Sequence, residues 1–298
     1  MASFLLLLVC LVLGACVAHT ARPPKDLARN LNWWVLHIAL PAMVLHIIPE
    51  LQFDSSLWFL SAAMWLVFFC GWCLFHWLGT RRNWSRSSMG AMALTASLSN
   101  TSFVGFPLIE ALRGKQALAY AAIADQLGSF MAISIGGTVM VAVYTGGKAD
   151  ARSIARKVLL FPPFLALLVA LLVALTPGWP IWVDDMLVRL GNTLAPLALF
   201  SVGLQLHLNA IKNQVGALLL GLTWKLGIAP ALVLACGLLL HINQSVLTVA
   251  LLEAAMAPMI SAAILAEQNR LDPPLANMMV GLGILLSFIT VPLWNLLV

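Results

Sequence analysis

Ten apolar runs, each close to the length of a membrane-spanning helix, constrain the fold of this chain more than any other feature. A helix needs about 20 mostly apolar residues to cross the hydrocarbon core of a bilayer. Continuous runs favour helices, because the strands of a membrane barrel show only alternating stretches of about ten residues. The runs cover residues 3–20, 30–49, 56–78, 88–111, 117–144, 157–176, 181–206, 215–240, 244–267 and 273–297. The sequence therefore predicts an all-α integral membrane protein with ten transmembrane helices.

Composition agrees with this interpretation. Hydrophobic residues make up 62% of the 298 residues and charged residues 9%, whereas a soluble domain has about 25% charged residues. The net charge of +5 does not indicate nucleic-acid binding, because no basic helix face or aromatic and basic strand accompanies it. The sequence has no phosphate-binding glycine loop, no His and Cys spacing typical of a metal site, and no nucleophile paired with a base. We therefore expect no enzyme, no cofactor, no metal and no nucleic-acid partner.

The first apolar run has two readings. Residues 1–20 resemble the core of a signal peptide, and Leu13-Gly14-Ala15-Cys16 resembles a lipoprotein cleavage site. A secretory signal normally begins with a basic region, but no Lys or Arg precedes Arg22. We therefore interpret this run as the first span.

Lys and Arg residues between the runs predict the orientation. Twelve lie in loops after odd-numbered runs: Arg22, Lys25, Arg29, Arg81, Arg82, Arg86, Lys148, Arg152, Arg156, Lys157, Lys212 and Arg270. Only two, Arg113 and Lys115, lie in loops on the other side. Cytoplasmic loops carry the excess of Lys and Arg. Both termini are thus expected outside the cytoplasm, in the periplasm if the membrane is a bacterial inner membrane.

The chain divides into two halves of similar length. Residues 1–145 and 157–298 each contain five runs, and a short basic cytoplasmic connector, 146–156, joins them. Five is an odd number, so the second half has inverted topology. The second run of each half contains a proline, Pro41 and Pro196, and so does the fourth, Pro107 and Pro258. Interruptions at corresponding positions of inverted halves point to a transporter binding site, although prolines are common in transmembrane helices and could align by chance.

Runs 4 and 9 have the strongest signs of a broken helix. In run 4, Asn100, Thr101 and Ser102 precede Gly105 and Pro107. Proline lacks an N–H and crowds the carbonyl four residues earlier, so we expect the break near Pro107. Run 9 contains Met256-Ala257-Pro258 among small residues, which permit a second helix to cross closely. If the two breaks cross, the free N–H groups of the half-helices would form an anion site; a simple proline kink is the alternative.

The run Asn100-Thr101-x-x-x-Gly105-x-Pro107-Leu108 resembles the fourth-span crossover of the auxin efflux carrier family, which includes PIN proteins and bacterial organic-acid and malate permeases. Asp125-Gln126, Lys225 with Pro230, the stretch 253–267 and the C-terminal Ser287-x-x-Thr290-x-Pro292 are also similar to that family. The resemblance implies crossing spans 4 and 9, transport of carboxylate compounds, and an elevator-like motion of spans 3–5 and 8–10 against a scaffold of spans 1, 2, 6 and 7. It also makes a homodimer through the scaffold plausible. The short connector resembles bacterial members rather than the long plant proteins.

Three charged residues lie within the apolar runs. Charge at mid-helix costs roughly 2.5–3.5 kcal/mol on insertion scales, so Asp125, Lys225 and Glu253 each need a reason to be there. Lys225 is expected to be the counter-charge of an organic anion, and Asp125, with its neighbour Gln126, and Glu253 to carry protons, since burial favours the neutral carboxyl. Alternatively, Lys225 forms a permanent ion pair, Asp125 caps a broken helix, and Glu253 is solvated at the interface.

The leading hypothesis is a secondary transporter for a small organic anion, coupled to protons or sodium. Expected substrate-binding residues are Asn100, Thr101, Ser102, Gly105, Pro107, Met256, Ala257 and Pro258, with Asp125, Gln126, Lys225 and Glu253 setting charge and coupling. A sodium-coupled symporter of the bile-acid type is the alternative within transport. A membrane enzyme or a non-transporting sensor is the alternative outside it.

Overall fold

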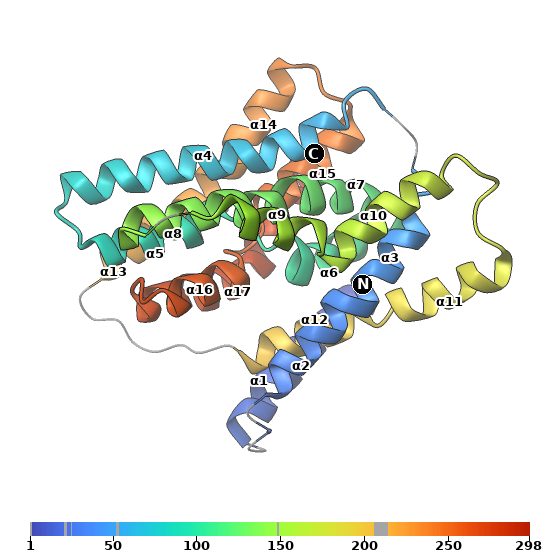
Figure 1. Ribbon diagram of the computed structural model, residues 1–298, viewed down its shortest axis with the longest axis horizontal. Helices are drawn as coiled ribbons and strands as arrows, with labels where there is room; N and C mark the ends of the chain where they lie inside the picture. Colours follow the sequence, from blue (N-terminus) through green and yellow to red (C-terminus); the bar gives the residue numbers. More distant parts are fainter. Residues whose placement is uncertain (1, 21–22, 25, 52–53, 148, 206–213) are drawn as a thin grey trace. The chain divides into compact units, whose positions relative to one another are not determined.

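Helices joined by short connections make up the described part of the chain in this computed structural model (Figure 1). The structure describes residues 2–20, 23–24, 26–51, 54–147, 149–205 and 214–298. Four residues used to predict the orientation, Arg22, Lys25, Lys148 and Lys212, lie outside these ranges.

Helices occupy every apolar run of the sequence. In the first half they are α1 (Ala2–Thr20), α2 (Leu27–Trp34), η1 (Val35–Ala39), α3 (Leu40–Ile47), α4 (Trp58–Arg81), α5 (Arg86–Ser97), η2 (Thr101–Gly105), α6 (Phe106–Arg113), η3 (Lys115–Ala117), α7 (Leu118–Ile123), η4 (Ala124–Ser129), η5 (Ala132–Gly137) and α8 (Thr138–Thr145). In the second half they are α9 (Ala151–Leu159), α10 (Pro162–Val173), α11 (Ile181–Gly191), α12 (Leu194–Leu204), α13 (Val215–Thr223), η6 (Trp224–Ile228), α14 (Ala229–Leu239), α15 (Gln244–Ala254), α16 (Ile260–Gln268) and α17 (Pro273–Asn295).

Several of these helices are long and apolar enough to cross a membrane. Within the described residues there are five, at Trp58–Arg81, Lys115–Thr145, Ile181–Leu204, Val215–Leu239 and Pro273–Asn295. The pair α9 and α10, bent by 56°, adds a sixth if it forms one broken span. The chain is therefore an all-helical integral membrane protein.

Three prolines follow π-helical segments at the same spacing. Pro41, Pro107 and Pro230 are each the second residue after η1, η2 and η6. A proline ring clashes with the carbonyl four residues earlier and offers it no N–H, and the wider π turn relieves this crowding. Four residues before Pro230, the carbonyl of Leu226 accepts a hydrogen bond from Trp294 Nε1 at 2.8 Å instead. These prolines bend or loosen their helices without breaking them.

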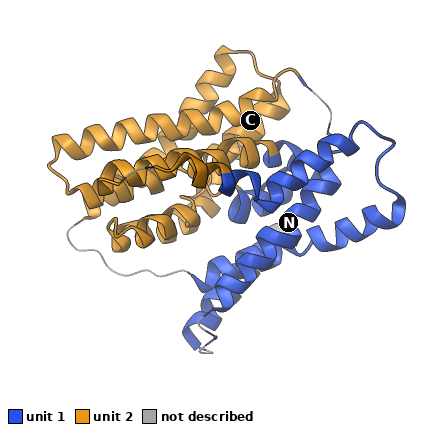
Figure 2. Ribbon diagram, viewed as in Figure 1, with its two compact units in different colours: residues 1–54, 102–122, 156–206 blue, residues 55–101, 123–155, 207–298 orange. Residues whose placement is uncertain are grey.

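The helices group into two compact units (Figure 2). Unit 1 consists of residues 1–54, 102–122 and 156–206, and unit 2 consists of residues 55–101, 123–155 and 207–298. In unit 1, α1 packs against α12 where two glycines meet: a Cβ on Gly14 would lie 2.1 Å from the Phe200 carbonyl oxygen. This close approach requires glycine, and it makes α1 part of the bundle.

Unit 2 is built around α4 and α5. Helix α4 packs against α5, α15 and η4, and α17 packs against α5, α13 and α16. These helices are buried along much of their length: in α5, the residues from Met89 to Ser97 are all buried. Most of the candidate residues discussed next lie in this unit.

Candidate functional site

Two helices of unit 2 stop within the apolar part of their runs. Helix α5 ends at Ser97, and Leu98 takes an extended conformation, with φ −117° and ψ 129°. Helix α15 ends at Ala254, and the next helix, α16, starts at Ile260. Each break frees backbone N–H and C=O groups that must find partners, because there is no water in a bilayer core to satisfy them.

The two breaks satisfy each other. The N–H of Asn100 donates to the Ala257 carbonyl oxygen at 2.8 Å, and the N–H of Met259 donates to the Leu98 carbonyl oxygen at 3.0 Å. Between these bonds, Ser99 and Pro258 form an isolated antiparallel bridge. Pro258 fits here because neither bond needs a donor from residue 258. The expected meeting of runs 4 and 9 is therefore seen as a short antiparallel pairing of 98–100 with 257–259.

The expected position of the break in run 4 was wrong. We expected it near Pro107, but the extended residues lie at 98–100, and Pro107 sits in a continuous helical stretch, two residues after η2. The π-helical segment η2 also precedes Pro107 and relieves its clash. Backbone pairing with the second break, rather than the proline, fixes where α5 stops.

Segment η6 caps both broken helices from the side. Trp224 Nε1 donates to the carbonyl oxygen of Ala96, in the last turn of α5, at 3.1 Å. Lys225 Nζ donates to the carbonyl oxygen of Ala254, the last residue of α15, at 2.6 Å. Terminal carbonyls of a helix lack partners and form the negative end of its dipole. Two adjacent side chains thus stabilise the two helix ends, one of them with a positive charge.

Lys225 is fully buried, and its ammonium group is incompletely paired. It donates to Ser99 Oγ at 2.8 Å as well as to Ala254. Among the residues that the structure describes, it forms no ion pair, which contradicts the alternative of a permanent bridge to an acid. An ammonium group has three donors, and within the described residues only two of these have an acceptor. The third donor has no acceptor among the described residues.

Asp125, in η4, is buried and well supplied with donors. Its carboxylate accepts a hydrogen bond from Thr101 Oγ1 at 2.5 Å and one from Gln126 Nε2 at 2.7 Å. Thr101 is the first residue of η2, so Asp125 holds the start of the helix that follows the break. This arrangement resembles the capping alternative, because Asp125 binds a side chain at a broken helix end.

Glu253 is buried in a different way. It has 0% exposure, which contradicts the alternative that it is solvated at the interface. Within the described part of the chain, neither of its carboxyl oxygens has a hydrogen-bond partner. The charges of Asp125 and Lys225 both act on it. Buried polar atoms are almost always hydrogen-bonded in native proteins, so the environment of Glu253 calls for a functional explanation.

Other buried polar atoms near the breaks are also without partners among the described residues. They are Ser97 Oγ, Gln126 Oε1 and Ser129 Oγ. Ser97, Ser99 and Trp224 were missed as site residues. The two serines stand directly before Asn100 in the same polar run, and Trp224 is a tryptophan in the middle of an apolar run rather than at its end. Those signals could have identified them.

The predicted binding residues divide between the two units. Asn100, Thr101, Met256, Ala257 and Pro258 belong to unit 2. There the pairing of the breaks brings Asn100 to Ala257, and Met256 and Ala257 are both fully buried. Three others, Ser102, Gly105 and Pro107, belong to unit 1.

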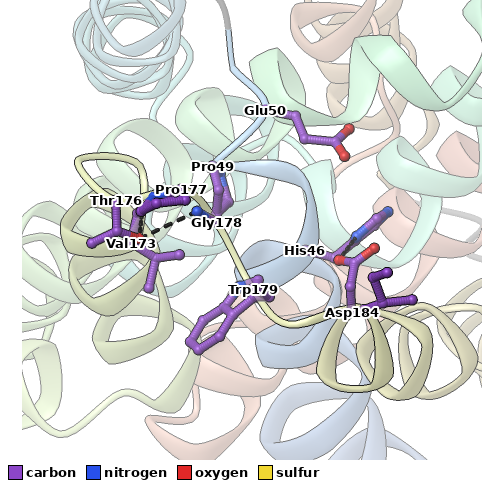
Figure 3. Close-up of a pocket in the computed structure, with 10 residues that line it drawn as sticks. His46, Pro49, Glu50, Val173, Thr176, Pro177, Gly178, Trp179 and Asp184 are labelled. Atoms are coloured by element: carbon purple, nitrogen blue, oxygen red, sulfur yellow. Dashed lines mark hydrogen bonds and ion pairs between the residues drawn. The ribbon is translucent and has the colours of Figure 1, made fainter.

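Unit 1 has a cavity of its own (Figure 3). Its volume is about 320 Å³, and its lining includes His46, Glu50, Trp179 and Asp184. His46 Nδ1 and Asp184 Oδ1 lie 2.6 Å apart, and Trp179 Nε1 donates to the Leu45 carbonyl oxygen at 2.8 Å. Among the described residues, no group of three His, Cys, Asp or Glu side chains could hold a metal ion here or elsewhere. His46 and Asp184 thus pair with each other, and Trp179 is held by the backbone.

Comparison with known proteins identifies the family. Residues 1–295 match the family described as membrane transport protein. A transporter of Methanothermobacter thermautotrophicus is 24% identical over 296 residues, which cover 98% of this chain and 96% of the relative. A transporter of Methanocaldococcus jannaschii is 25% identical over 286 residues, covering 91% and 90%. Both relatives are described as uncharacterized transporters. The match over nearly the whole chain shows that this protein belongs to the membrane transport protein family, the family of the auxin efflux carriers.

Proposed function

We propose that this chain is a secondary active transporter of a small organic anion, most simply a carboxylate, with its binding site at the paired helix breaks of unit 2. One observation carries the proposal: a fully buried ammonium group, Lys225, has a free donor beside two broken helices. A buried charge without a directly bonded counter-ion is costly. A carboxylate that arrives as a ligand would supply the missing acceptor and offset the charge.

The residues around Lys225 suit a carboxylate. Asn100 and Thr101 lie at the break in run 4, and the backbone at Ala257 and the side chain of Met256 lie at the break in run 9. We propose that the substrate contacts these residues together with Pro258. Gln126 Oε1 is a further group whose hydrogen-bonding capacity is unused within the described residues.

Elevator-like alternating access is the proposed mechanism. Ten spans in two inverted repeats would give a scaffold of spans 1, 2, 6 and 7. Unit 1 contains residues 1–54 and 156–206, which cover those four spans, and most of spans 3, 5, 8, 9 and 10 belong to unit 2. This division supports a mobile unit 2 that carries the site. The exception is 102–122, which the expectation assigned to the mobile part and which groups with unit 1.

The proposal includes an orientation of the chain in the membrane. Both termini would face the outside, in the periplasm for a bacterial inner membrane, because the basic loops would face the cytoplasm. A homodimer would form through the scaffold spans and leave unit 2 free to move. Protons or sodium ions are the coupling ions that the proposal considers.

Counterflow in proteoliposomes tests the proposal. Proteoliposomes that contain the purified protein are loaded with an unlabelled carboxylate, and the same compound in labelled form is added outside. The panel of carboxylates is malate, succinate, lactate and indole acetate. Saturable exchange is expected for at least one acid, and Asn100→Ala should reduce it to the level of protein-free liposomes. Asn269→Ala is the matched control, because within the described residues the Asn269 side chain bonds only to the Leu265 carbonyl oxygen of its own helix end, at 2.8 Å.

Each contrary result has a distinct meaning. Exchange that persists unchanged in Asn100→Ala would contradict the location of the binding site at the paired breaks. An absolute requirement for sodium would favour a symporter of the bile-acid type. Binding of an acid without any exchange would favour a sensor.

A further inference from the structure

We infer that Glu253 is the proton-binding group of this transporter, and that one proton binds its carboxylate and crosses the membrane with each substrate anion. The inference rests on the proposed function, since it assigns the coupling ion of the same site. It starts from the geometry of a single side chain at the end of α15.

Glu253 occupies a place that suits a neutral acid. It is fully buried, and within the described residues no donor reaches either carboxyl oxygen. The nearest cation, Lys225, gives its hydrogen bonds to Ala254 and Ser99 instead. A carboxylate without donors in a dry interior is far more costly than a neutral carboxyl group. The closed arrangement seen here therefore accommodates Glu253 with a proton on it.

The groups that face Glu253 are few. Helix α15 packs against α4, α14 and α17. Helix α17 has no titratable residue, α14 has only Cys236, and α4 has Cys70, Cys73, His76 and Arg81. The two charged side chains that act on Glu253 come from other segments: Asp125 from η4 and Lys225 from η6.

Charge balance then links the proton to the anion. Two donors reach the carboxyl group of Asp125, and Lys225 Nζ donates to two oxygen atoms. With Asp125 ionised and Lys225 protonated, their charges cancel, so the cluster is neutral when Glu253 is protonated and carries one negative charge when it is not. An anion is repelled by the second state and admitted by the first.

A transport cycle follows from this balance. Where the site opens to water, a proton adds to a Glu253 oxygen as the anion binds beside Lys225. After the site opens on the other side, the anion leaves, water solvates the carboxylate, and the O–H bond of Glu253 breaks to release the proton. One proton and one anion cross together, and no oxidation or reduction is involved.

The test compares uptake driven by a pH gradient with exchange at equal pH. Proteoliposomes take up labelled malate, or the member of the panel that shows counterflow, with the outside more acidic than the inside. Wild-type protein is expected to accumulate label under the gradient. Glu253→Gln should lose this accumulation selectively, because glutamine resembles the protonated acid and cannot exchange a proton; counterflow at equal pH should suffer less. Glu267→Gln is the matched control, an exposed acid in α16, and should behave as wild type.

Gradient-driven accumulation that survives in Glu253→Gln would overturn the inference. A second measurement does not depend on the substrate: infrared difference spectra between wild type and Glu253→Gln at neutral pH. A protonated carboxyl band that is lost in Glu253→Gln supports the inference, and a lost carboxylate band contradicts it. If no acid in the panel exchanges, the proposed function fails, while the infrared result still decides whether Glu253 holds a proton.

Discussion

The two units of this protein treat their buried polar groups in opposite ways. In unit 1, His46 and Asp184 beside the cavity pair with each other, and Trp179 bonds to the backbone. In unit 2, the cluster around Lys225 and Glu253 is fully buried, yet several of its polar atoms have no partner among the described residues. The proposed binding site therefore rests on unused hydrogen-bonding capacity rather than on cavity volume.

The physical reason is the cost of burial. A polar group in a cavity open to water is satisfied by water, so its presence requires no ligand. A polar or charged group that is buried without a partner destabilises the folded state by roughly 1–3 kcal/mol or more. A native protein keeps such a group only where another interaction or a function compensates for this cost. Substitutions in the two regions should therefore differ in effect, and the following predictions begin with the largest.

Lys225→Met should have the largest effect. Methionine fits a similar volume but removes the donor to Ala254 and Ser99 and the charge that would bind the anion. Leaving buried acceptors unpaired costs about 1–3 kcal/mol each, so counterflow should fall to the level of protein-free liposomes and thermal stability should decrease. Lys115→Met, at an exposed lysine that bonds Asn192 Oδ1 at 3.3 Å, is the control. Full activity of Lys225→Met would contradict the location of the anion site in unit 2.

Gly283→Ala should disturb the pairing of the two helix breaks by pushing against Pro258. A Cβ on Gly283 would lie 2.3 Å from Pro258 Cδ, so the break in run 9 must shift. Overpacking of this kind costs about 1–3 kcal/mol, and we expect a strong loss of counterflow with a lower unfolding temperature. Gly216→Ala is the control, since no described residue lies within 4 Å of a Cβ at that position. Equal behaviour of the two variants would show that the pairing tolerates displacement.

Pro258→Ala should reduce exchange more than Pro107→Ala, although the two prolines occupy corresponding runs of the two halves. Pro258 lies inside a break, where alanine would add a buried N–H and allow α15 to extend, so exchange should decrease. Pro107 lies in the first turn of α6, where alanine fits the helix, and a smaller loss is expected. Both are measured by counterflow at several substrate concentrations. A larger loss in Pro107→Ala would restore Pro107 as the origin of the break.

Asp184→Asn should have the smallest effect, because it lies in the region where polar groups are already paired. The side chains of His46 and Asp184 are 22% and 37% exposed, and a pair exposed to this degree contributes about 0–1 kcal/mol. Unfolding temperature should change slightly, and counterflow should match that of wild type. A loss of transport as large as that of Lys225→Met would mean that the cavity of unit 1 binds the substrate.

The sequence predicted much of the fold because membrane helices are specified locally. The length of an apolar run and the positions of basic loops follow from the bilayer itself, and every predicted run contains helix. The position of the break in run 4 could not be predicted in this way. It depends on backbone hydrogen bonds between Leu98, Asn100 and residues more than 150 positions away in the chain, whereas Pro107 is a local signal that a π turn absorbs.

The sequence identified several candidate residues by their type, but it did not predict which groups they contact. Lys225 and Glu253 stood out because charge is rare within an apolar run, and both are fully buried. Their partners were not predictable: Lys225 binds a helix end and Ser99 rather than an acid. Ser99 is a small residue common in membrane helices, so its role appears only when the two breaks are brought together.

Substrate-induced thermal stabilisation of purified protein in detergent tests the location of the site most directly. A ligand that binds only the folded protein raises its unfolding temperature, by an amount that grows with the logarithm of ligand concentration above the Kd. The account predicts that a carboxylate active in counterflow raises the unfolding temperature of wild type and of Asp184→Asn, with no rise for Lys225→Met. A rise in Lys225→Met equal to that of wild type would contradict the placement of the anion site at the paired helix breaks.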